Sequence, residues 1–112
     1  MLVSSGLSPL LAAIGATLGV EHVVGPQVEW RDGRLTGRTL PPLVIGQRKA
    51  SVTRQRLGDW GLDVDFAGSF AYADSISDLP LLELVGHPTA VYADKQLAAL
   101  ARERGWPALN DD

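Results

Sequence analysis

The hydrophobic pattern begins with short apolar runs separated by glycine, which predict strands that alternate with helices. Residues 2–6 are typical of a buried strand broken at Gly6. Between Ser8, a suitable N-cap, and Gly19, apolar residues recur every three or four positions, as on one face of a helix. Residues 20–24 are rich in β-branched side chains and predict a second strand.

Polar and apolar residues then alternate over residues 28–37, which predicts a β-hairpin. Its centre is Asp32-Gly33, a pair that favours a tight turn between two strands. The Pro41-Pro42 pair ends this pattern and predicts a loop over residues 43–46. The rest of the chain predicts a helix over 47–57, a break over 58–61, a strand over 69–73, a helix over 79–85 capped by Asp78, a strand over 89–93, and a helix over 95–104 closed by Gly105.

Alternating strands and helices predict an α/β fold with a mainly parallel sheet covered by helices. The chain has 112 residues, which suits one domain spanning residues 1–112 with one core. Hydrophobic residues make up 46% of the chain and charged residues 21%, as in a soluble globular protein.

Charge and composition exclude several classes of partner. The net charge is -3 and basic residues are interspersed with acidic ones, so no cationic face is available for nucleic acid. Apolar runs are shorter than the ~20 residues that span a bilayer, so no membrane partner is expected. The chain has no cysteine and no basic residues in its opening segment, and we therefore expect a cytoplasmic protein.

Two carboxylates mark the end of one predicted strand. Asp74 closes the strand and Asp78 opens the next helix. Clustered carboxylates need a cation or hydrogen bonds to compensate their charge, and hard oxygen ligands suit Mg²⁺. The alternative is structural, with Asp74 as a turn residue and Asp78 as a helix cap.

A second polar segment follows the first strand. Ser4, Ser5 and Gly6 offer a hydroxyl and two amides ahead of a helix, which can cradle a phosphate. Lys49 could supply a cation to the same phosphate. The alternatives are a serine-rich turn that caps the helix, and a lysine on a solvated helix face.

These segments follow the order of the second, third and fourth motifs of the haloacid-dehalogenase-like superfamily. The chain resembles its phosphoserine-phosphatase-like branch over nearly the whole length, and the fourth motif is the most specific. The resemblance implies a Rossmann-like three-layer sandwich and a Mg²⁺-dependent phosphatase acting on a small phosphorylated metabolite. The matching segments are Leu2-Val3-Ser4-Ser5-Gly6, Gly46-Gln47-Arg48-Lys49, and the run from Tyr72 to Leu82 that contains Asp74 and Asp78.

The resemblance also implies a role for each residue. Ser4 would hydrogen-bond a phosphoryl oxygen, aided by the amides of Ser5 and Gly6, and Lys49 would neutralise charge there. Further roles fall to the fourth motif: Asp74 would bind Mg²⁺ directly, Asp78 would orient a metal-bound water or Lys49, and Ser77, where relatives often have Asn, would support them.

The chain departs from the family at the nucleophile. The nucleophile and general acid of this superfamily are two Asp residues in a D-x-D-x-[TV] motif, upstream of the Ser motif. The sequence contains only Asp63-Val64-Asp65, which lies in a turn and lacks the following Thr or Val. We therefore expect a C-terminal portion without the first central strand and the cap, inactive alone because the covalent step has no carboxylate.

Two other hypotheses remain open at this point. The chain could be a pseudoenzyme that holds phosphate or Mg²⁺ without turnover, or a truncated fragment without a function of its own. In the family's strand order, the missing strand lies between those ending at Ser4 and Asp74. We expect a homodimer or a complementing N-terminal segment to fill this gap, unless the two strands pair directly.

Overall fold

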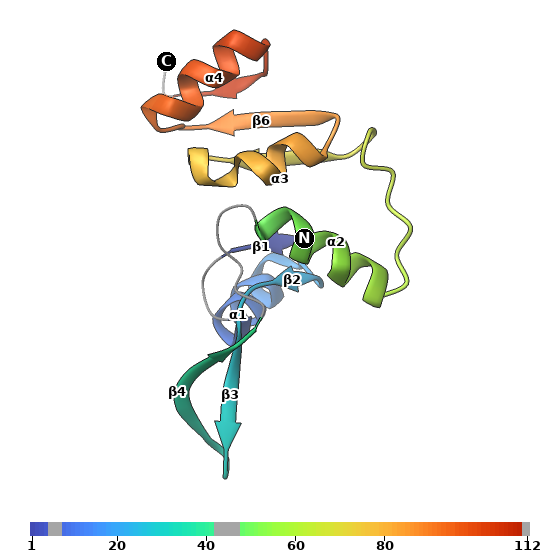
Figure 1. The fold of residues 1–112 in the computed structure, drawn as a ribbon, viewed down its shortest axis with the longest axis vertical. Coiled ribbons are helices and arrows are strands. Elements are labelled where there is room, and N and C mark those ends of the chain that lie inside the picture. Colours follow the sequence, from blue (N-terminus) through green and yellow to red (C-terminus); the bar gives the residue numbers. More distant parts are fainter. Residues whose placement is uncertain (5–7, 42–47, 111–112) are drawn as a thin grey trace. The chain divides into compact units, whose positions relative to one another are not determined.

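The computed structural model describes residues 1–4, 8–41 and 48–110. It divides into two compact units, Met1–Arg56 and Leu57–Asp112, and each unit is described by itself. Figure 1 gives the order of the elements along the chain. The predicted loop over 43–46, together with Gln47, Ser5 and Gly6, lies outside the described residues.

The first unit is built around a parallel pair of short strands. Strand β1 (Leu2–Val3) pairs in parallel with β2 (Val23–Val24), and helix α1 (Ser8–Leu18) connects them. Helix α2 (Arg48–Asp59) supplies Val52, which is buried with Val24 beside the half-buried Val3. Three valines thus join β1, β2 and α2 in a small core.

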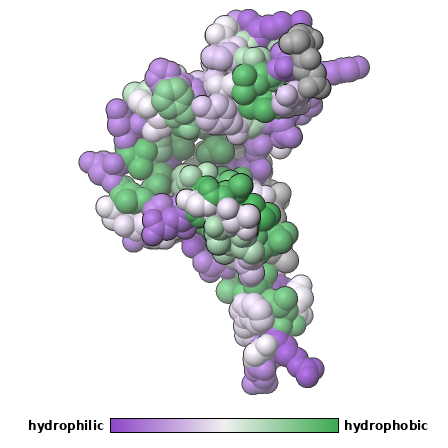
Figure 2. Space-filling model, turned by 180° about the vertical axis from the view of Figure 1, so that it is seen from behind, coloured by the Kyte–Doolittle hydropathy of each residue, from purple (hydrophilic) through white to green (hydrophobic). Residues whose placement is uncertain are grey.

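The first unit also carries the predicted hairpin. Strands β3 (Gln27–Arg31) and β4 (Arg34–Leu40) pair antiparallel around Asp32-Gly33. Both turn residues have positive φ, 53° and 76°, as a two-residue hairpin turn with the twist of its strands requires. Every residue of β4 is exposed, and Figure 2 shows the tip of the hairpin as hydrophilic.

The second unit is a three-stranded parallel sheet with two α-helices. The strand order is β5 (Phe70–Ala73), β6 (His87–Val91) and β7 (Ala108–Leu109), so β5 lies at one edge. A 3₁₀ turn, η1 (Ile76–Asp78), leads into α3 (Leu79–Leu84), and α4 (Lys95–Arg104) follows β6. The core consists of the buried residues Leu82 of α3, Ala90 of β6, and Leu97 and Ala101 of α4.

The three longest helices end alike. In α1 the amide of Val20 donates to the carbonyl of Gly15, five residues earlier. In α4 the amide of Trp106 donates to the carbonyl of Ala101, again five residues earlier. The residue after the last helical one is glycine with positive φ, 74° at Gly19 and 70° at Gly105, which allows the chain to reverse and satisfy terminal carbonyls. Helix α2 has the equivalent hydrogen bond, from the amide of Leu62 to the carbonyl of Leu57, but its glycine of positive φ, Gly61, comes two residues after Asp59.

Several predicted boundaries were wrong. The strand expected over 20–24 begins only at Val23, because Val20 takes part in the end of α1. Helix α2 continues through Gly58 to Asp59, since its reversal comes at Gly61. Strand β6 lies two residues earlier than expected and ends at Val91, because Tyr92 has a φ of 44°, which leaves the strand conformation.

The predicted α/β fold class, with parallel strands and one antiparallel hairpin, is confirmed. The expectation of one domain over residues 1–112 stays a prediction, because the structure is described as two units. None of the helices in the described residues has the length and apolar character needed to cross a membrane.

Candidate functional site

The loop over residues 74–78, here called the acidic loop, follows β5 directly and is highly ordered by local hydrogen bonds. Ser75 is extended and caps the 3₁₀ turn, since its Oγ accepts from the amide of Ser77 at 3.2 Å. The hydroxyls of Ser75 and Ser77 lie 2.9 Å apart and share a hydrogen bond. These contacts hold the middle of the acidic loop, between Asp74 and Asp78, in one turn.

Asp78 stands at the junction of the 3₁₀ turn and α3. It occupies the N-cap position of α3, yet its side chain makes no capping hydrogen bond. Pro80, early in the first turn, has no amide hydrogen to be capped. The alternative in which Asp78 serves as the side-chain cap of α3 is therefore wrong, and Asp78 is half-buried.

Asp94 joins the acidic loop to the start of α4. Its Oδ1 accepts from the amide of Leu97 at 2.8 Å, which caps α4. Its Oδ2 accepts from the amide of Ile76 at 3.0 Å, inside the acidic loop. The backbone amide of Asp94 donates to the carbonyl of Asp74 at 2.9 Å. One residue thus contacts the first half of the acidic loop at two points, the carbonyl of Asp74 and the amide of Ile76.

The same hydrogen bonds affect the ionisation of Asp94. The backbone amides of Leu97 and Ile76 lower the pKa of Asp94 below its ordinary value, against a smaller opposing effect of desolvation and with a minor contribution from the Ser75 hydroxyl. Asp94 is therefore an anion at neutral pH that accepts several hydrogen bonds.

An open hollow adjoins the acidic loop. It has a volume of about 350 Å³ and is lined by Tyr72, Ala73, Asp74, Val91 and Tyr92. These residues come from the carboxyl ends of β5 and β6, where parallel sheets bind ligands. Asp74 is exposed, so its carboxylate is accessible to a ligand in solution.

The other predicted site residues belong to the first unit. The amide of Ser4 donates to the carbonyl of Val24 at 3.0 Å, which extends the pairing of β1 with β2. Lys49 lies in the first turn of α2, three residues before Val52, and Val52 packs with Val3, the neighbour of Ser4. Ser4 and Lys49 are therefore both carried by elements that contribute to this small core.

Burial of Lys49 was not expected from the sequence. Only 9% of its surface is exposed, so the alternative of a lysine on a solvated helix face is wrong. A lysine that is largely buried requires polar partners for its ammonium group, and Lys49 has contacts of this kind. The structure thus removes the simplest structural explanation for Lys49 as well as for Asp78.

The predicted site residues are divided between the two units, with Ser4 and Lys49 in the first and the acidic loop in the second. Sequence reasoning missed Asp94. Its position after a strand and directly before a helix resembles that of Asp74, which was the signal available. Its contact with Ile76, 18 residues away, could not be read from the sequence.

Comparison with known proteins identifies the family. The sequence profile of haloacid dehalogenase-like hydrolases matches residues 1–83. The chain belongs to this family. The resemblance noted in the sequence is thereby confirmed, including the phosphoserine-phosphatase-like relatives.

Phosphatases are among the relatives of this chain. It is 34% identical to a histidinol-phosphatase of Neisseria meningitidis serogroup C (strain 8013), over 98% of this chain and 50% of that protein. It is 39% identical to phosphoserine phosphatase SerB1 of Mycobacterium tuberculosis (strain ATCC 25618 / H37Rv), over 87% of this chain and 31% of that protein. The chain thus spans half or less of the length of these curated relatives.

A solved structure shares the hydrolase fold. The crystal structure of a protein of unknown function from Bordetella pertussis Tohama I is 37% identical, with a TM-score of 0.86. The match covers 93% of this chain and 47% of that one. The arrangement of strands and helices described above is therefore that of a known folded protein in crystals.

The acidic loop suits the Mg²⁺ that members of this family use. Carboxylate oxygens are the ligands that Mg²⁺ prefers, and the ion is commonly held by one or two carboxylates, waters and substrate phosphate. Asp74 and Asp78 meet this requirement. The described residues contain no group of three or more His, Cys, Asp or Glu that could hold a metal ion by themselves.

Proposed function

We propose that this chain supplies the phosphate- and magnesium-binding part of a phosphatase, a phosphoric monoester hydrolase acting on a small phosphorylated metabolite in the cytoplasm. Family membership and the two named phosphatase relatives support the reaction class. The observation that carries the proposal is the acidic loop, which holds two carboxylates at the end of a parallel strand and beside an open hollow.

In this proposal the first unit binds the phosphoryl group. The hydroxyl of Ser4 and the amides of Ser5 and Gly6 donate hydrogen bonds to phosphoryl oxygens, and Lys49 neutralises their charge. The burial of Lys49 supports this role, because a desolvated cation interacts strongly with an anion. Phosphoryl transfer depends mainly on such positioning and charge neutralisation.

In the second unit, Asp74 contributes a direct oxygen ligand and Asp78 orients a bound water. Ser77 supports the loop through its hydrogen bond to Ser75. When Mg²⁺ is bound, it neutralises charge on the phosphoryl oxygens. Each protein group acts by holding an oxygen or a proton in place, as this reaction class requires.

This chain alone is not expected to hydrolyse a phosphate ester. The sequence contains one D-x-D triplet, Asp63-Val64-Asp65, without the Thr or Val that the family's nucleophile motif has. A covalent phosphoryl intermediate needs a carboxylate nucleophile aligned with the phosphate. We therefore expect the purified chain to leave an aryl phosphate intact in the presence of Mg²⁺.

The experiment compares this chain with a fusion. The part of the Neisseria histidinol-phosphatase that the chain does not match is joined ahead of residue 1, and both proteins are assayed with an aryl phosphate and Mg²⁺. We expect hydrolysis by the fusion, loss of that activity in Asp74→Asn, and none by the chain alone. A fusion that melts cooperatively but lacks activity would contradict the proposal.

A second candidate is a pseudoenzyme that binds phosphate or Mg²⁺ without turnover. The same acidic loop and buried lysine favour this candidate. It differs from the phosphatase proposal in the expected activity of the fusion. A pseudoenzyme would show chemical-shift changes on addition of inorganic phosphate and Mg²⁺, while its fusion would stay inactive. Binding by the chain together with activity of the fusion would exclude it.

The proposal also includes a partner, either a second copy or a complementing N-terminal segment. In α1, Leu10, Ile14 and Leu18 share one face, and their exposed fractions are 61%, 43% and 65%. Strand β5 lies at the edge of its sheet. Exposed apolar stripes and sheet edges favour association. Light scattering should give a mass above the 11.9 kDa of a monomer; a monodisperse monomer would exclude the homodimer.

A further inference from the structure

Asp94 makes more contacts with the acidic loop than capping a helix requires. An N-cap needs one oxygen, which accepts from an amide in the first turn, and Oδ1 of Asp94 does this for Leu97 at 2.8 Å. The second oxygen, Oδ2, turns to Ile76, which is 18 residues away in the chain. Asp94 therefore serves two elements with two different oxygens.

The contact with Ile76 controls the start of the turn that carries Asp78. Ile76 is the first residue of η1, so its amide has no partner inside the turn and must find one elsewhere. Asp94 provides that partner at 3.0 Å. On the other side of Ser75, the carbonyl of Asp74 accepts from the amide of Asp94 at 2.9 Å.

The two contacts enclose Ser75 and fix the backbone on both sides of it. Because side-chain directions follow the backbone, they set where the carboxylates of Asp74 and Asp78 point. Sites that bind a ligand through a few groups depend on such support, since small shifts weaken binding. Here the supporting residue is Asp94, which lies outside the acidic loop.

We propose that Asp94 is a positioning residue, which holds the acidic loop in the geometry that presents Asp74 and Asp78 to a divalent cation. The inference rests on the proposed function of that loop. Asp94 itself does not contact the cation or the phosphate. Its role is to hold the amide of Ile76 and the carbonyl of Asp74.

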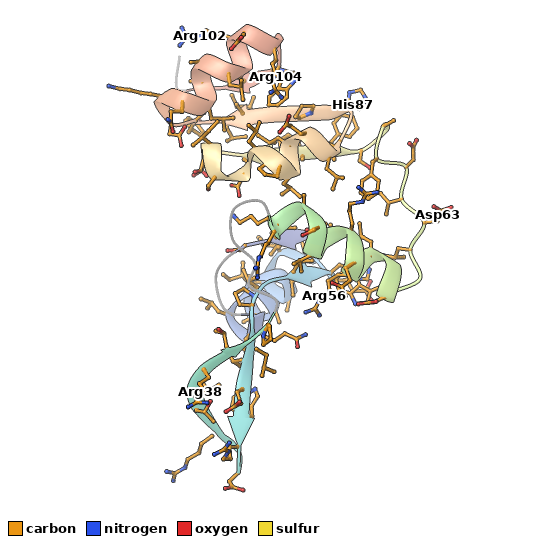
Figure 3. All side chains as sticks on the ribbon, in the orientation of Figure 1. Arg38, Arg56, Asp63, His87, Arg102 and Arg104 are labelled. Carbon is orange, nitrogen blue, oxygen red and sulfur yellow. The ribbon has the colours of Figure 1, made fainter. Side chains whose placement is uncertain are left out.

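The variant Asp94→Ser separates the two roles of Asp94. A serine hydroxyl still caps α4, but serine has no second oxygen in the place of Oδ2, which accepts from Ile76. The matched control is Asp63→Ser, the same change and the same loss of charge at an exposed aspartate in the chain segment before β5, labelled in Figure 3. Both are made in the full 112-residue chain, labelled with ¹⁵N.

Amide hydrogen exchange gives the first readout. In Asp94→Ser we expect the Ile76 amide to lose roughly tenfold in protection while that of Leu97 changes by less than roughly threefold. Asp63→Ser should leave both unchanged. Equal loss at Ile76 and Leu97 would show that Asp94 acts only on helix stability, and unchanged protection at Ile76 would show that the contact is unimportant; either overturns the proposal.

Mn²⁺, a paramagnetic substitute for Mg²⁺, gives the second readout. We expect broadening of the amide signals of the acidic loop in the unsubstituted chain and in Asp63→Ser, and a concentration of Mn²⁺ roughly tenfold higher for the same broadening in Asp94→Ser. Equal broadening in Asp94→Ser, despite lost protection at Ile76, would overturn the positioning role. Absence of broadening in the unsubstituted chain would overturn the metal site in the proposed function, while exchange at Ile76 would still decide whether Asp94 holds the loop.

Ile76→Pro is a second variant that does not depend on the folding of Asp94→Ser. Proline removes the amide that Asp94 accepts from, and it suits this position, since Ser75 is extended and Ile76 starts a helical turn. Asp94 keeps its bond to Leu97. We expect the same weakening of Mn²⁺ broadening as in Asp94→Ser; a wild-type response would contradict the proposal.

Discussion

The two units of this chain use their helices differently. In the second unit, α4 buries Leu97 and Ala101 against Leu82 and Ala90, so its apolar stripe lies in a core. In the first unit, α1 buries Leu11 but leaves Leu10, Ile14 and Leu18 exposed. The same 3.6-residue period thus produced a covered stripe in one unit and an open one in the other.

This difference shows that a hydrophobic pattern specifies a helix but not what covers it. The second unit has a three-stranded parallel sheet against which both helices pack, whereas the parallel sheet of the first unit is a pair of two-residue strands beside the β3–β4 hairpin. A sheet of two short strands cannot cover an eleven-residue helix. The acidic loop stands on the better-packed unit, which suits a site whose geometry must be fixed.

The largest expected effect comes from removing core volume in each unit. Leu82 has no exposed surface, so Leu82→Ala should lower the free energy of unfolding by about 2–5 kcal/mol. Val52→Ala removes two methyl groups beside a smaller cluster and should cost about 1.5 kcal/mol. Native-state hydrogen exchange measures the free energy of opening for each unit. Equal losses would contradict the difference in packing.

Helix ends provide a control, because α1 and α4 end alike. Gly19 and Gly105 both have φ near 70°, and a Cβ at either would meet no atom within 4 Å. Alanine at each position should therefore cost the same, about 1–2 kcal/mol, from backbone strain alone. Denaturant melts of Gly19→Ala and Gly105→Ala check this. A clear inequality would mean that the units differ in their helix ends as well as in packing.

A smaller effect is expected from the ion pair on the second unit. Arg104 contacts Glu83 at 3.0 Å and lies over the ring of Trp106 at 5.1 Å from its centre. Both groups of the ion pair are more than a third exposed, so Arg104→Met should cost about 0.5–1 kcal/mol. Arg102→Met is the matched control from the same last turn (Figure 3). Equal melting temperatures of the two variants would show that these contacts contribute nothing.

The dependence of stability on pH should follow Asp94. Its pKa is lowered in the folded chain, so its stabilisation is fully present above the ordinary aspartate pKa of about 3.9 and is lost as pH falls through the lower folded value. Melting temperatures between neutral and acidic pH should therefore fall less steeply in Asp94→Ser than in the unsubstituted chain. Parallel curves would contradict this role.

Much of the fold could be predicted from the sequence where local signals agree. Helix α4 was predicted with both ends correct, because Gly105 supplies the left-handed residue after its last turn. The hairpin turn was also predicted from a local signal, because Asp32 and Gly33 adopt the positive φ that the turn needs. Strand β7 was missed, because two residues after Pro107 carry no periodicity.

Other features depend on contacts that no local pattern contains. Strand β6 includes Pro88, which the sequence did not place in a strand; β7 pairs only with Ala90 and Val91, so β6 has one neighbour there and tolerates proline. The acidic loop was predicted from its own residues. Asp94, which supports it, and the burial of Lys49 follow from tertiary structure and could not be predicted.

We propose that the acidic loop is a partial Mg²⁺ site. The most direct test is a Mg²⁺ titration of the ¹⁵N-labelled chain, followed by amide chemical shifts. We expect changes confined to residues 74–78 and their neighbours, saturating only at millimolar Mg²⁺ because two carboxylates complete only part of the shell, and absent in Asp74→Asn. Micromolar affinity, or the same changes in Asp74→Asn, would contradict the account.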